Sequence, residues 1–298
     1  MKAHSKALLW LVVSATMFGA MAFAAKVASA RLTGPQVAMV RFAIGLLPVV
    51  AVPRIRRTAL AYHRLDLLLI RGFFGGLAVL FYFICIQHVS VGVATLLNYT
   101  APIYSGFFSM LFIGERFSPK VLIPLPIALA GVFLVVHAHA RPGELVGFGR
   151  WEMMGALSAI CSGAAVTAIR AARRGESSWS IYGSFCLIGL LTTLPQGLTT
   201  WRNPSHDEWS ALAVMSLLAI GAQLTMTFSL RWVDAMTVGV ISQLAVIVSM
   251  ILGALLIGEH ITMMAAIGAA LSIAGVAGVT FVTSGKQKAQ PATDDVVA

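Results

Sequence analysis

The sequence predicts an all-α integral membrane protein with ten transmembrane helices, arranged as two inverted five-helix repeats. Hydrophobic residues make up 58% of its 298 residues and charged residues only 11%. Such a composition is too apolar for an ordinary soluble domain. Ten apolar stretches reach the roughly 20 residues that a helix needs to cross a bilayer. The second half of the chain also repeats the first at a constant offset of 144 residues, as from Gly114 to Gly258.

The repeat is clearest around the end of the fourth span of each half. Gly114-Glu115 recurs as Gly258-Glu259, and Ala130-Gly131-Val132 recurs as Ala274-Gly275-Val276. Apolar sequence of low complexity produces chance matches, but it does not easily produce two such motifs at one spacing. The predicted units are a first repeat at residues 1–139, a second at 140–283 and a polar, disordered tail at 284–298.

Each repeat contains five predicted spans joined by short connections, which leave no room for a soluble catalytic domain. In the first repeat the spans cover residues 7–28, 33–52, 65–86, 92–113 and 119–136. In the second they cover residues 151–169, 178–199, 208–230, 235–257 and 262–282. The first span resembles a secretory signal, but its counterpart in the second repeat is internal, so we expect the first span to be retained.

The positions of lysine and arginine predict the orientation of the spans. With the N-terminus inside, fourteen of these residues fall in inner segments and five in outer ones. Positive residues accumulate on the cytoplasmic side, so both termini are expected in the cytoplasm. Because five is an odd number, the second repeat enters the membrane from the opposite side. Inverted repeats of this kind recur in secondary transporters. Glu115 should then face the cytoplasm and Glu259 the opposite side.

Several other classes of protein do not fit this composition. Cys85, Cys161 and Cys186 all lie in apolar spans, so we expect them to be packing residues without disulfides. The net charge of +10 comes from short clusters between spans, which favours a lipid bilayer as partner and not nucleic acid. His137 and His139 lack a carboxylate or thiol at ligand spacing, and no phosphate-binding loop or nucleophile elbow is present. We therefore expect no metal, no cofactor and no catalytic residue.

Two five-span units, each with Gly-Glu closing its fourth span and Ala-Gly-Val in its fifth, resemble the drug/metabolite transporter superfamily. The resemblance is to the branch with two EamA-type units, and within it to the YddG-like amino-acid exporters, over residues 7–282. It implies ten helices, a central cavity lined mainly by the first four helices of each unit, and fifth helices at the periphery. Phe18 stands where the family often has tryptophan, and Val246 where it often has a second proline. Both departures weaken any transfer of substrate preference.

Polar side chains interrupt the fourth span of each repeat at equivalent positions. Asn98 and Tyr99 do so in the first repeat, and Ser242 and Gln243 in the second. Polar groups inside a bilayer are costly and tend to face a cavity, so these four are candidates for substrate binding. Hydrogen bonding between helices is the alternative. Pro102 removes a backbone hydrogen bond beside the first pair and is the candidate hinge.

Faces of small residues in three further spans lead to the candidates Tyr82, Ser158 and Gln223. Such faces also occur wherever helices pack closely, which is the open alternative. Two charged residues, Arg41 and Arg71, lie within spans. We expect their side chains to extend to the lipid headgroups, and contact with a substrate carboxylate is the alternative.

These observations predict an alternating-access secondary carrier that exports small amphipathic metabolites across the bacterial inner membrane. Amino acids, including aromatic ones, follow from the resemblance alone. The alternatives are a membrane-embedded enzyme acting on a lipid-linked substrate, or a carrier for a different metabolite or drug. No carboxylate lies centrally in a span, which favours facilitated diffusion over proton coupling. The expected partners are the small-molecule substrate and the lipid bilayer.

Overall fold

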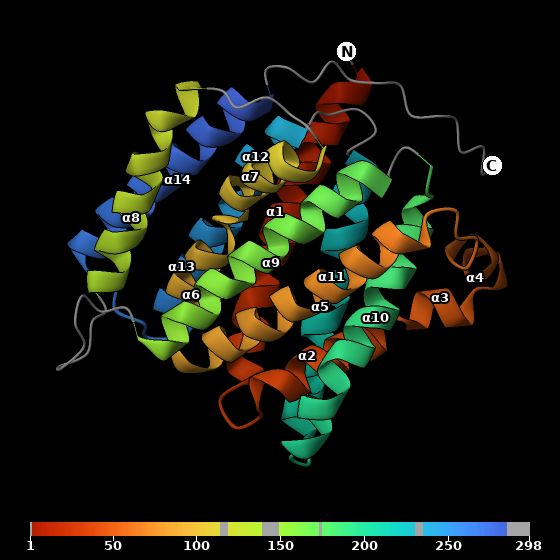
Figure 1. Ribbon diagram of the computed structural model, residues 1–298. Helices are drawn as coiled ribbons and strands as arrows, with labels where there is room; N and C mark the ends of the chain where they lie inside the picture. The colour runs from red at the N-terminus through yellow and green to blue at the C-terminus, as the bar shows by residue number, and fades with distance from the viewer. Residues whose placement is uncertain (1, 114–118, 139–148, 173–174, 230–234, 285–298) are drawn as a thin grey trace.

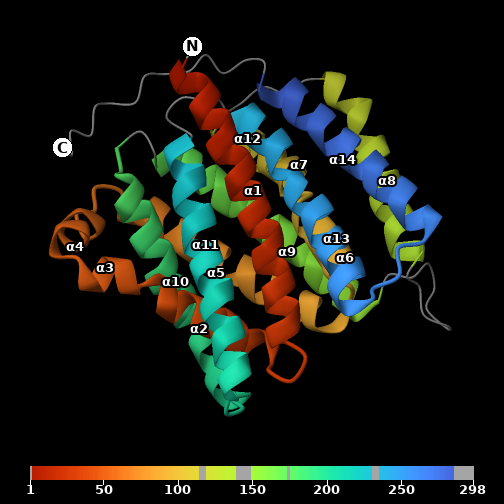
Figure 2. The same cartoon turned by 180° about the vertical axis from the view of Figure 1, so that it is seen from behind.

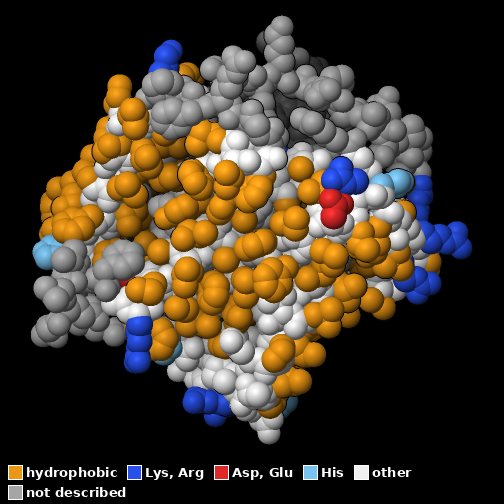
Figure 3. Space-filling view, viewed as in Figure 1, with side chains coloured by type: hydrophobic (Ala, Val, Ile, Leu, Met, Phe, Trp, Pro, Cys, Tyr) orange, Lys and Arg blue, Asp and Glu red, His pale blue; other side chains and the backbone are white. Residues whose placement is uncertain are grey.

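The computed structural model describes residues 2–113, 119–138, 149–172, 175–229 and 235–284. Within these ranges every regular element is a helix (Figures 1 and 2). Nine segments of the described chain are long and apolar enough to cross a membrane. Large hydrophobic side chains cover much of the surface, and lysine and arginine lie mainly toward its margins (Figure 3). The prediction of an all-helical, multi-pass membrane protein is confirmed.

The helices follow the predicted spans closely. Those of the first repeat are α1 (Lys2–Ala28), α2 (Gly34–Gly45), α3 (Leu47–Ala51), α4 (Pro53–Ala59), α5 (Leu65–His88), α6 (Val91–Asn98), α7 (Ala101–Ile113), the 3-10 helix η1 (Pro119–Leu122) and α8 (Pro124–Ala138). Those of the second are α9 (Arg150–Ala172), α10 (Ser178–Thr199), α11 (His206–Ser229), α12 (Ala235–Ser242), α13 (Leu244–Ile257) and α14 (Met263–Ser284).

The fourth predicted span is two helices instead of one. α6 ends at Asn98, Tyr99 and Thr100 form a turn, and α7 begins at Ala101. The Thr100 hydroxyl donates to the Leu97 carbonyl at 2.6 Å, which satisfies one carbonyl at the end of α6. Pro102 lies in the first turn of α7, where its missing N–H costs least. This break explains why the described chain has nine candidate spans where the sequence predicts ten.

The second predicted span, residues 33–52, is also divided. α2 ends at Gly45, and α3 begins at Leu47 with Pro48 in its first turn. A proline cannot donate the hydrogen bond that would continue α2, so the helix direction changes there. α4 then lies in a stretch for which the sequence predicts only a connection. Both short helices project from the side of the bundle, and α4 packs beside α10 (Figure 1).

Contacts between the two repeats obey the same offset of 144 residues as the sequence. The Ser14 hydroxyl on α1 donates to the Ala222 carbonyl on α11 at 2.7 Å. The Ser158 hydroxyl oxygen on α9 lies 2.8 Å from the Ala78 carbonyl oxygen on α5. Both residues of the second contact are the repeat counterparts of residues in the first. The packing of α1 on α11 therefore corresponds, at the repeat offset, to the packing of α9 on α5.

The fifth helices of the repeats, α8 and α14, pack on each other at one edge of the bundle (Figures 1 and 2). Glycines make the contact. A Cβ atom at Gly131 would clash with the Ser272 backbone nitrogen and lie 2.6 Å from the Gly268 carbonyl. A Cβ atom at Gly275 would lie 2.7 Å from the Ala128 Cβ. Small residues allow this backbone approach, and the peripheral position implied by the family resemblance is confirmed.

The end of α1 and the start of α9 lie on the same face of the bundle. The Lys26 ammonium donates to the carbonyls of Ile86 at 2.9 Å and Val89 at 2.6 Å, at the end of α5. The neighbouring His88 ring stacks on Trp151, in the first turn of α9, with 3.5 Å between ring centroids. α1 and α9 are equivalent helices of the two repeats, and the last turn of α1 and the first turn of α9 both contact the end of α5.

Candidate functional site

The main cavity lies between the repeats and has a volume of about 200 Å³. Its walls come from α1, α2, α5, α6, α9, α10, α11 and α12, with no contribution from α8 or α14 in the described chain. Five of the seven predicted substrate-binding residues line it: Tyr82, Asn98, Tyr99, Gln223 and Ser242. Ser158 and Gln243 do not reach its wall. Five of the predicted positions thus lie together in one cavity, and their role in substrate binding stays a prediction.

Asn98 is held in the cavity wall by two hydroxyl groups. Ser158 donates to the Asn98 Oδ1 atom at 2.8 Å, and Ser162 donates to the same atom at 3.1 Å. Ser158 is fully buried and also lies within hydrogen-bond distance of the Ala78 carbonyl. Ser158 and Ser162 thus fix the Asn98 side-chain oxygen, and the Asn98 amide carries two further N–H donors.

Gln243 joins the broken fourth helices of the two repeats. Its side-chain nitrogen donates to the Tyr99 carbonyl at 3.2 Å, and its side chain is 3% exposed. Tyr99 is the counterpart of Gln243 at the offset of 144, so this hydrogen bond joins equivalent positions of the two repeats. It satisfies a carbonyl freed by the break after α6. The geometry thus gives Gln243 the helix-joining role that the sequence left open as an alternative.

Tyr82 reaches the cavity from α5 together with Gly75 and Ala78, as the shared helical face predicts. Its hydroxyl lies 2.9 Å from the Thr95 hydroxyl on α6, which in turn donates to the Val91 carbonyl at 2.6 Å. The tyrosine ring is therefore fixed as a rigid part of the wall.

The expectation that Arg41 and Arg71 extend to the headgroups is wrong. Their side chains are 8% and 6% exposed and line the main cavity. Phe185 of α10, which the sequence reasoning did not select, lies against both guanidinium groups. A signal was present, because Arg71 precedes Gly75 by one helical turn on the face that continues to Tyr82.

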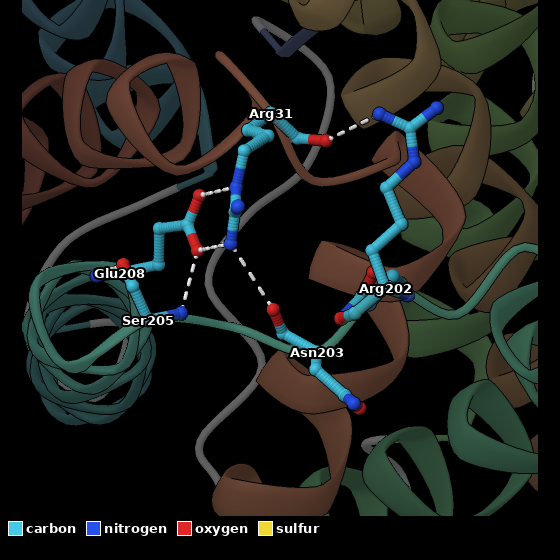
Figure 4. Close-up of polar contacts among 6 residues, drawn as sticks. Arg31, Arg202, Asn203, Ser205 and Glu208 are labelled. Atoms are coloured by element: carbon cyan, nitrogen blue, oxygen red, sulfur yellow. Dashed lines mark hydrogen bonds and ion pairs between the residues drawn. The ribbon is translucent and has the colours of Figure 1, made fainter.

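A polar network ties the α1–α2 connection to the α10–α11 connection (Figure 4). The Arg31 guanidinium donates to both carboxylate oxygens of Glu208 at 2.8 Å, and to the Asn203 carbonyl at 3.1 Å. The Arg202 side chain donates to the Arg31 carbonyl at 2.9 Å, and the Ser205 N–H donates to Glu208 at 2.7 Å. Hydrogen bonds to the Glu208 carboxylate raise the pKa of the Arg31 guanidinium, which stays charged. These contacts hold the two repeats together at this face.

The second Gly-Glu motif joins the end of α13 to the start of α6. Gly258 ends α13 in the left-handed conformation, with φ of 69°, which glycine adopts without steric cost. The chain then folds back, so that the Glu259 N–H donates to the Gly253 carbonyl at 3.0 Å. The Glu259 carboxylate accepts the Val91 N–H at 3.0 and 3.1 Å, at the N-terminus of α6. A carboxylate is favoured there because the first N–H groups of a helix lack partners.

The described residues include the three cysteines and most of the other residues that the sequence analysis considered. The three cysteines are buried and free. No group of three or more histidine, cysteine, aspartate or glutamate residues in the described part of the chain is placed to hold a metal ion. The first Gly-Glu motif at Gly114 and Glu115, together with His139, Asp234 and nearly all of the predicted tail, lies outside the described residues.

Comparisons with known proteins agree with this architecture. The pseudopaline exporter CntI of Pseudomonas aeruginosa is 27% identical over 240 residues, covering 80% of this chain and 83% of the exporter. An uncharacterised transporter of Archaeoglobus fulgidus is 26% identical over 204 residues, covering 68% and 72%. Solute carrier family 35 member E4 of Homo sapiens is 24% identical over 202 residues, covering 64% of this chain and 56% of that protein.

A solved structure titled only "Crystal structure of protein" has the same fold. It covers 94% of this chain and 98% of its own, with a TM-score of 0.64 at 21% identity. The model of the EamA-like transporter family matches residues 5–137 and 149–281, one match for each repeat. With both five-helix units matched and the cavity between them, the chain belongs to the EamA-like transporter family, whose relatives here are transporters of the drug/metabolite superfamily.

Proposed function

We propose that this protein is a secondary carrier that exports small amphipathic metabolites, amino acids including aromatic ones among them, across the bacterial inner membrane. The observation that carries the proposal is the cavity of about 200 Å³ enclosed by helices of both repeats. Its wall combines aromatic rings, such as Tyr82 and Tyr99, with the amides of Asn98 and Gln223. Apolar walls with a few polar groups are typical of small-molecule sites. A relative that is named as an exporter supports the direction of transport.

Alternating access by inverted repeats is the proposed mechanism, with both termini in the cytoplasm. The end of α1 and the start of α9 both contact the end of α5, which supports opposite directions for the two repeats. The contact of Ser14 with the Ala222 carbonyl and that of Ser158 with the Ala78 carbonyl are counterparts of each other at the repeat offset. They support two halves of similar structure, each of which can adopt the conformation of the other during transport. The arginine and lysine bias supports a cytoplasmic position for the termini.

Labelling of single cysteines tests this topology. In a variant without native cysteines, we expect His260→Cys to react with a membrane-impermeant maleimide added to intact cells, and Lys120→Cys to react only after lysis. Both side chains are exposed, at predicted opposite faces. Labelling of both positions from outside, or of Lys120→Cys alone, would contradict the proposed orientation.

Facilitated diffusion is the proposed mode of energy coupling. The described residues that line the cavity include no aspartate or glutamate that could take up a proton as access alternates. We expect counterflow in proteoliposomes to be independent of an imposed pH gradient. Accumulation of substrate against its own gradient, abolished by a protonophore, would contradict this expectation.

Efflux from proteoliposomes tests the proposed function directly. Vesicles loaded with labelled phenylalanine should release it faster with the protein than without. Tyr99→Ala and Asn98→Ala should slow release about tenfold, because each removes cavity contacts worth roughly 1–2 kcal/mol. Asn203→Ala, at an exposed loop position, is the matched control and should transport normally. Retention of every amino acid tested, with turnover of a lipid-linked substrate instead, would favour the enzyme alternative.

A further inference from the structure

Two arginine side chains from neighbouring helices enter the main cavity. Arg41 comes from α2 and Arg71 from α5, and they are 8% and 6% exposed. A guanidinium does not lose its proton in a protein, and a buried charge is costly unless it is compensated. Two positive charges in one cavity, placed close enough to repel each other, therefore need a negative or electron-rich partner.

Phe185 supplies part of that compensation. The Arg71 Cζ atom lies 3.9 Å from the centroid of the Phe185 ring, and the Arg41 Cζ atom lies 5.7 Å from it. Both distances fall within the range of roughly 6 Å for cation–π attraction. Gly75 makes room for this arrangement, because a Cβ atom there would clash with Arg71 Nη1 and lie 2.9 Å from the Phe185 ring. An aromatic ring has no lone pair to accept a full hydrogen bond, so it does not replace the oxygen acceptors that the guanidinium N–H groups need.

Several of those N–H groups are unpaired in the described part of the chain. The Nε and Nη1 atoms of Arg41 and the Nε atom of Arg71 are buried without a hydrogen-bond partner. The described residues lining the cavity include no carboxylate. The great majority of buried hydrogen-bond donors in proteins have a partner. These unpaired atoms therefore indicate the place of a ligand with acceptor oxygens.

We propose that Arg41 and Arg71 form a carboxylate site and that the carrier prefers substrates of net negative charge. A carboxylate accepts two parallel N–H bonds from one guanidinium, in the plane of that group. No described carboxylate in the wall is placed to receive a substrate ammonium group. An anion is therefore better matched than a neutral zwitterion. This inference rests on the proposed carrier function and narrows its substrate class.

The two repeats contribute different kinds of residue to this site. Phe185 is the counterpart of Arg41 at the offset of 144, and Met215 is the counterpart of Arg71. Both positive charges thus belong to the first repeat, and the ring between them belongs to the second. Movement of one repeat against the other would change the contact between arginine and phenylalanine, and with it the direction in which the free N–H groups point.

Ligand-induced thermal stabilisation of the purified full chain tests the site. The probes are glutarate, L-phenylalanine and L-phenylalaninamide, which lacks the carboxylate. Glutarate should raise the unfolding midpoint most, L-phenylalanine less and L-phenylalaninamide not at all. Arg41→Gln and Arg71→Gln should each weaken glutarate binding about tenfold to a hundredfold, as expected for lost hydrogen bonds to a charged group. Inorganic phosphate is the comparison anion, and binding as tight as that of glutarate would overturn the carboxylate assignment.

Matched variants separate a binding role from a folding role. Arg57→Gln changes an exposed arginine of α4 and should bind glutarate normally. Arg71→Lys keeps the charge but loses the paired donors, so it should bind with intermediate affinity. A glutarate effect that survives in both glutamine variants, equal effects of L-phenylalanine and its amide, or no stabilisation by any anion would overturn the site.

Transport measurements distinguish failure of the carboxylate site from failure of the proposed carrier function. Efflux of L-phenylalanine and L-phenylalaninamide at equal rates, unchanged in Arg41→Gln and Arg71→Gln, would leave the carrier standing and remove the carboxylate site. Binding of glutarate that needs both arginines, without movement of any solute across proteoliposomes, would keep the site and remove the carrier.

Discussion

Replacing Gly131 by leucine is expected to lower the thermal unfolding midpoint by roughly 5–10 °C. A Cβ atom at this position meets backbone atoms of Ser272 and Gly268 on α14, and backbone cannot move aside as a flexible side chain can. Overpacking costs about 1–3 kcal/mol, and about 1 kcal/mol corresponds to a few degrees in a chain of this size. The measurement is thermal unfolding of the purified protein in detergent, followed by loss of the monodisperse peak.

Gly175→Leu is the matched control for this substitution. A Cβ atom at Gly175 has no neighbour within 4 Å, so the same change there should leave the midpoint unaltered. Gly275→Leu, at the symmetry-equivalent position, should behave like Gly131→Leu. Equal midpoints for Gly131→Leu and Gly175→Leu would contradict the close packing of α8 on α14.

Glu259→Ala is expected to increase access to the cavity from the face at which Glu259 lies. The substitution removes the carboxylate that accepts the Val91 N–H at the start of α6. Hydrogen bonds to a charged group contribute about 1.5–3 kcal/mol, so the population open at this face should rise about tenfold or more. A cysteine at Met21, which lines the cavity, reports the change in a variant without native cysteines. Its reaction with an impermeant maleimide, added on the Glu259 side, should accelerate by the same factor.

Two further variants test whether loss of the Glu259 carboxylate causes the faster labelling. Glu259→Gln keeps a neutral acceptor for the Val91 N–H and should give a smaller acceleration. Asp66→Ala removes an exposed carboxylate that pairs with Arg64, at the other end of α5, and should have no effect. If Glu259→Ala labels at the parent rate, the contact between α13 and α6 does not hold this face closed.

The sequence was sufficient for the fold class because its signals are local and repeated. Apolar stretches of fixed length indicate spans, and an offset shared by Gly114-Glu115 and Gly258-Glu259 indicates two units. The same offset placed polar residues at one depth in both repeats, and Asn98, Tyr99 and Ser242 do line one cavity. The offset did not show that the side chains of Ser158 and Gln243 form hydrogen bonds with other helices. A sequence contains the same residue whether its polar side chain contacts a ligand or a neighbouring helix.

By itself, the sequence determined the class of protein, its two repeats and the polar positions around which the cavity forms. Only the tertiary structure decided which partners those positions find. Arg41 and Arg71 lie 30 residues apart on separate helices, and Phe185 comes from the other repeat. Hydrophobicity acts on each helix separately and can be read along the chain. Pairing between side chains depends on helix rotation and close packing, which arise only when the helices of both repeats are assembled.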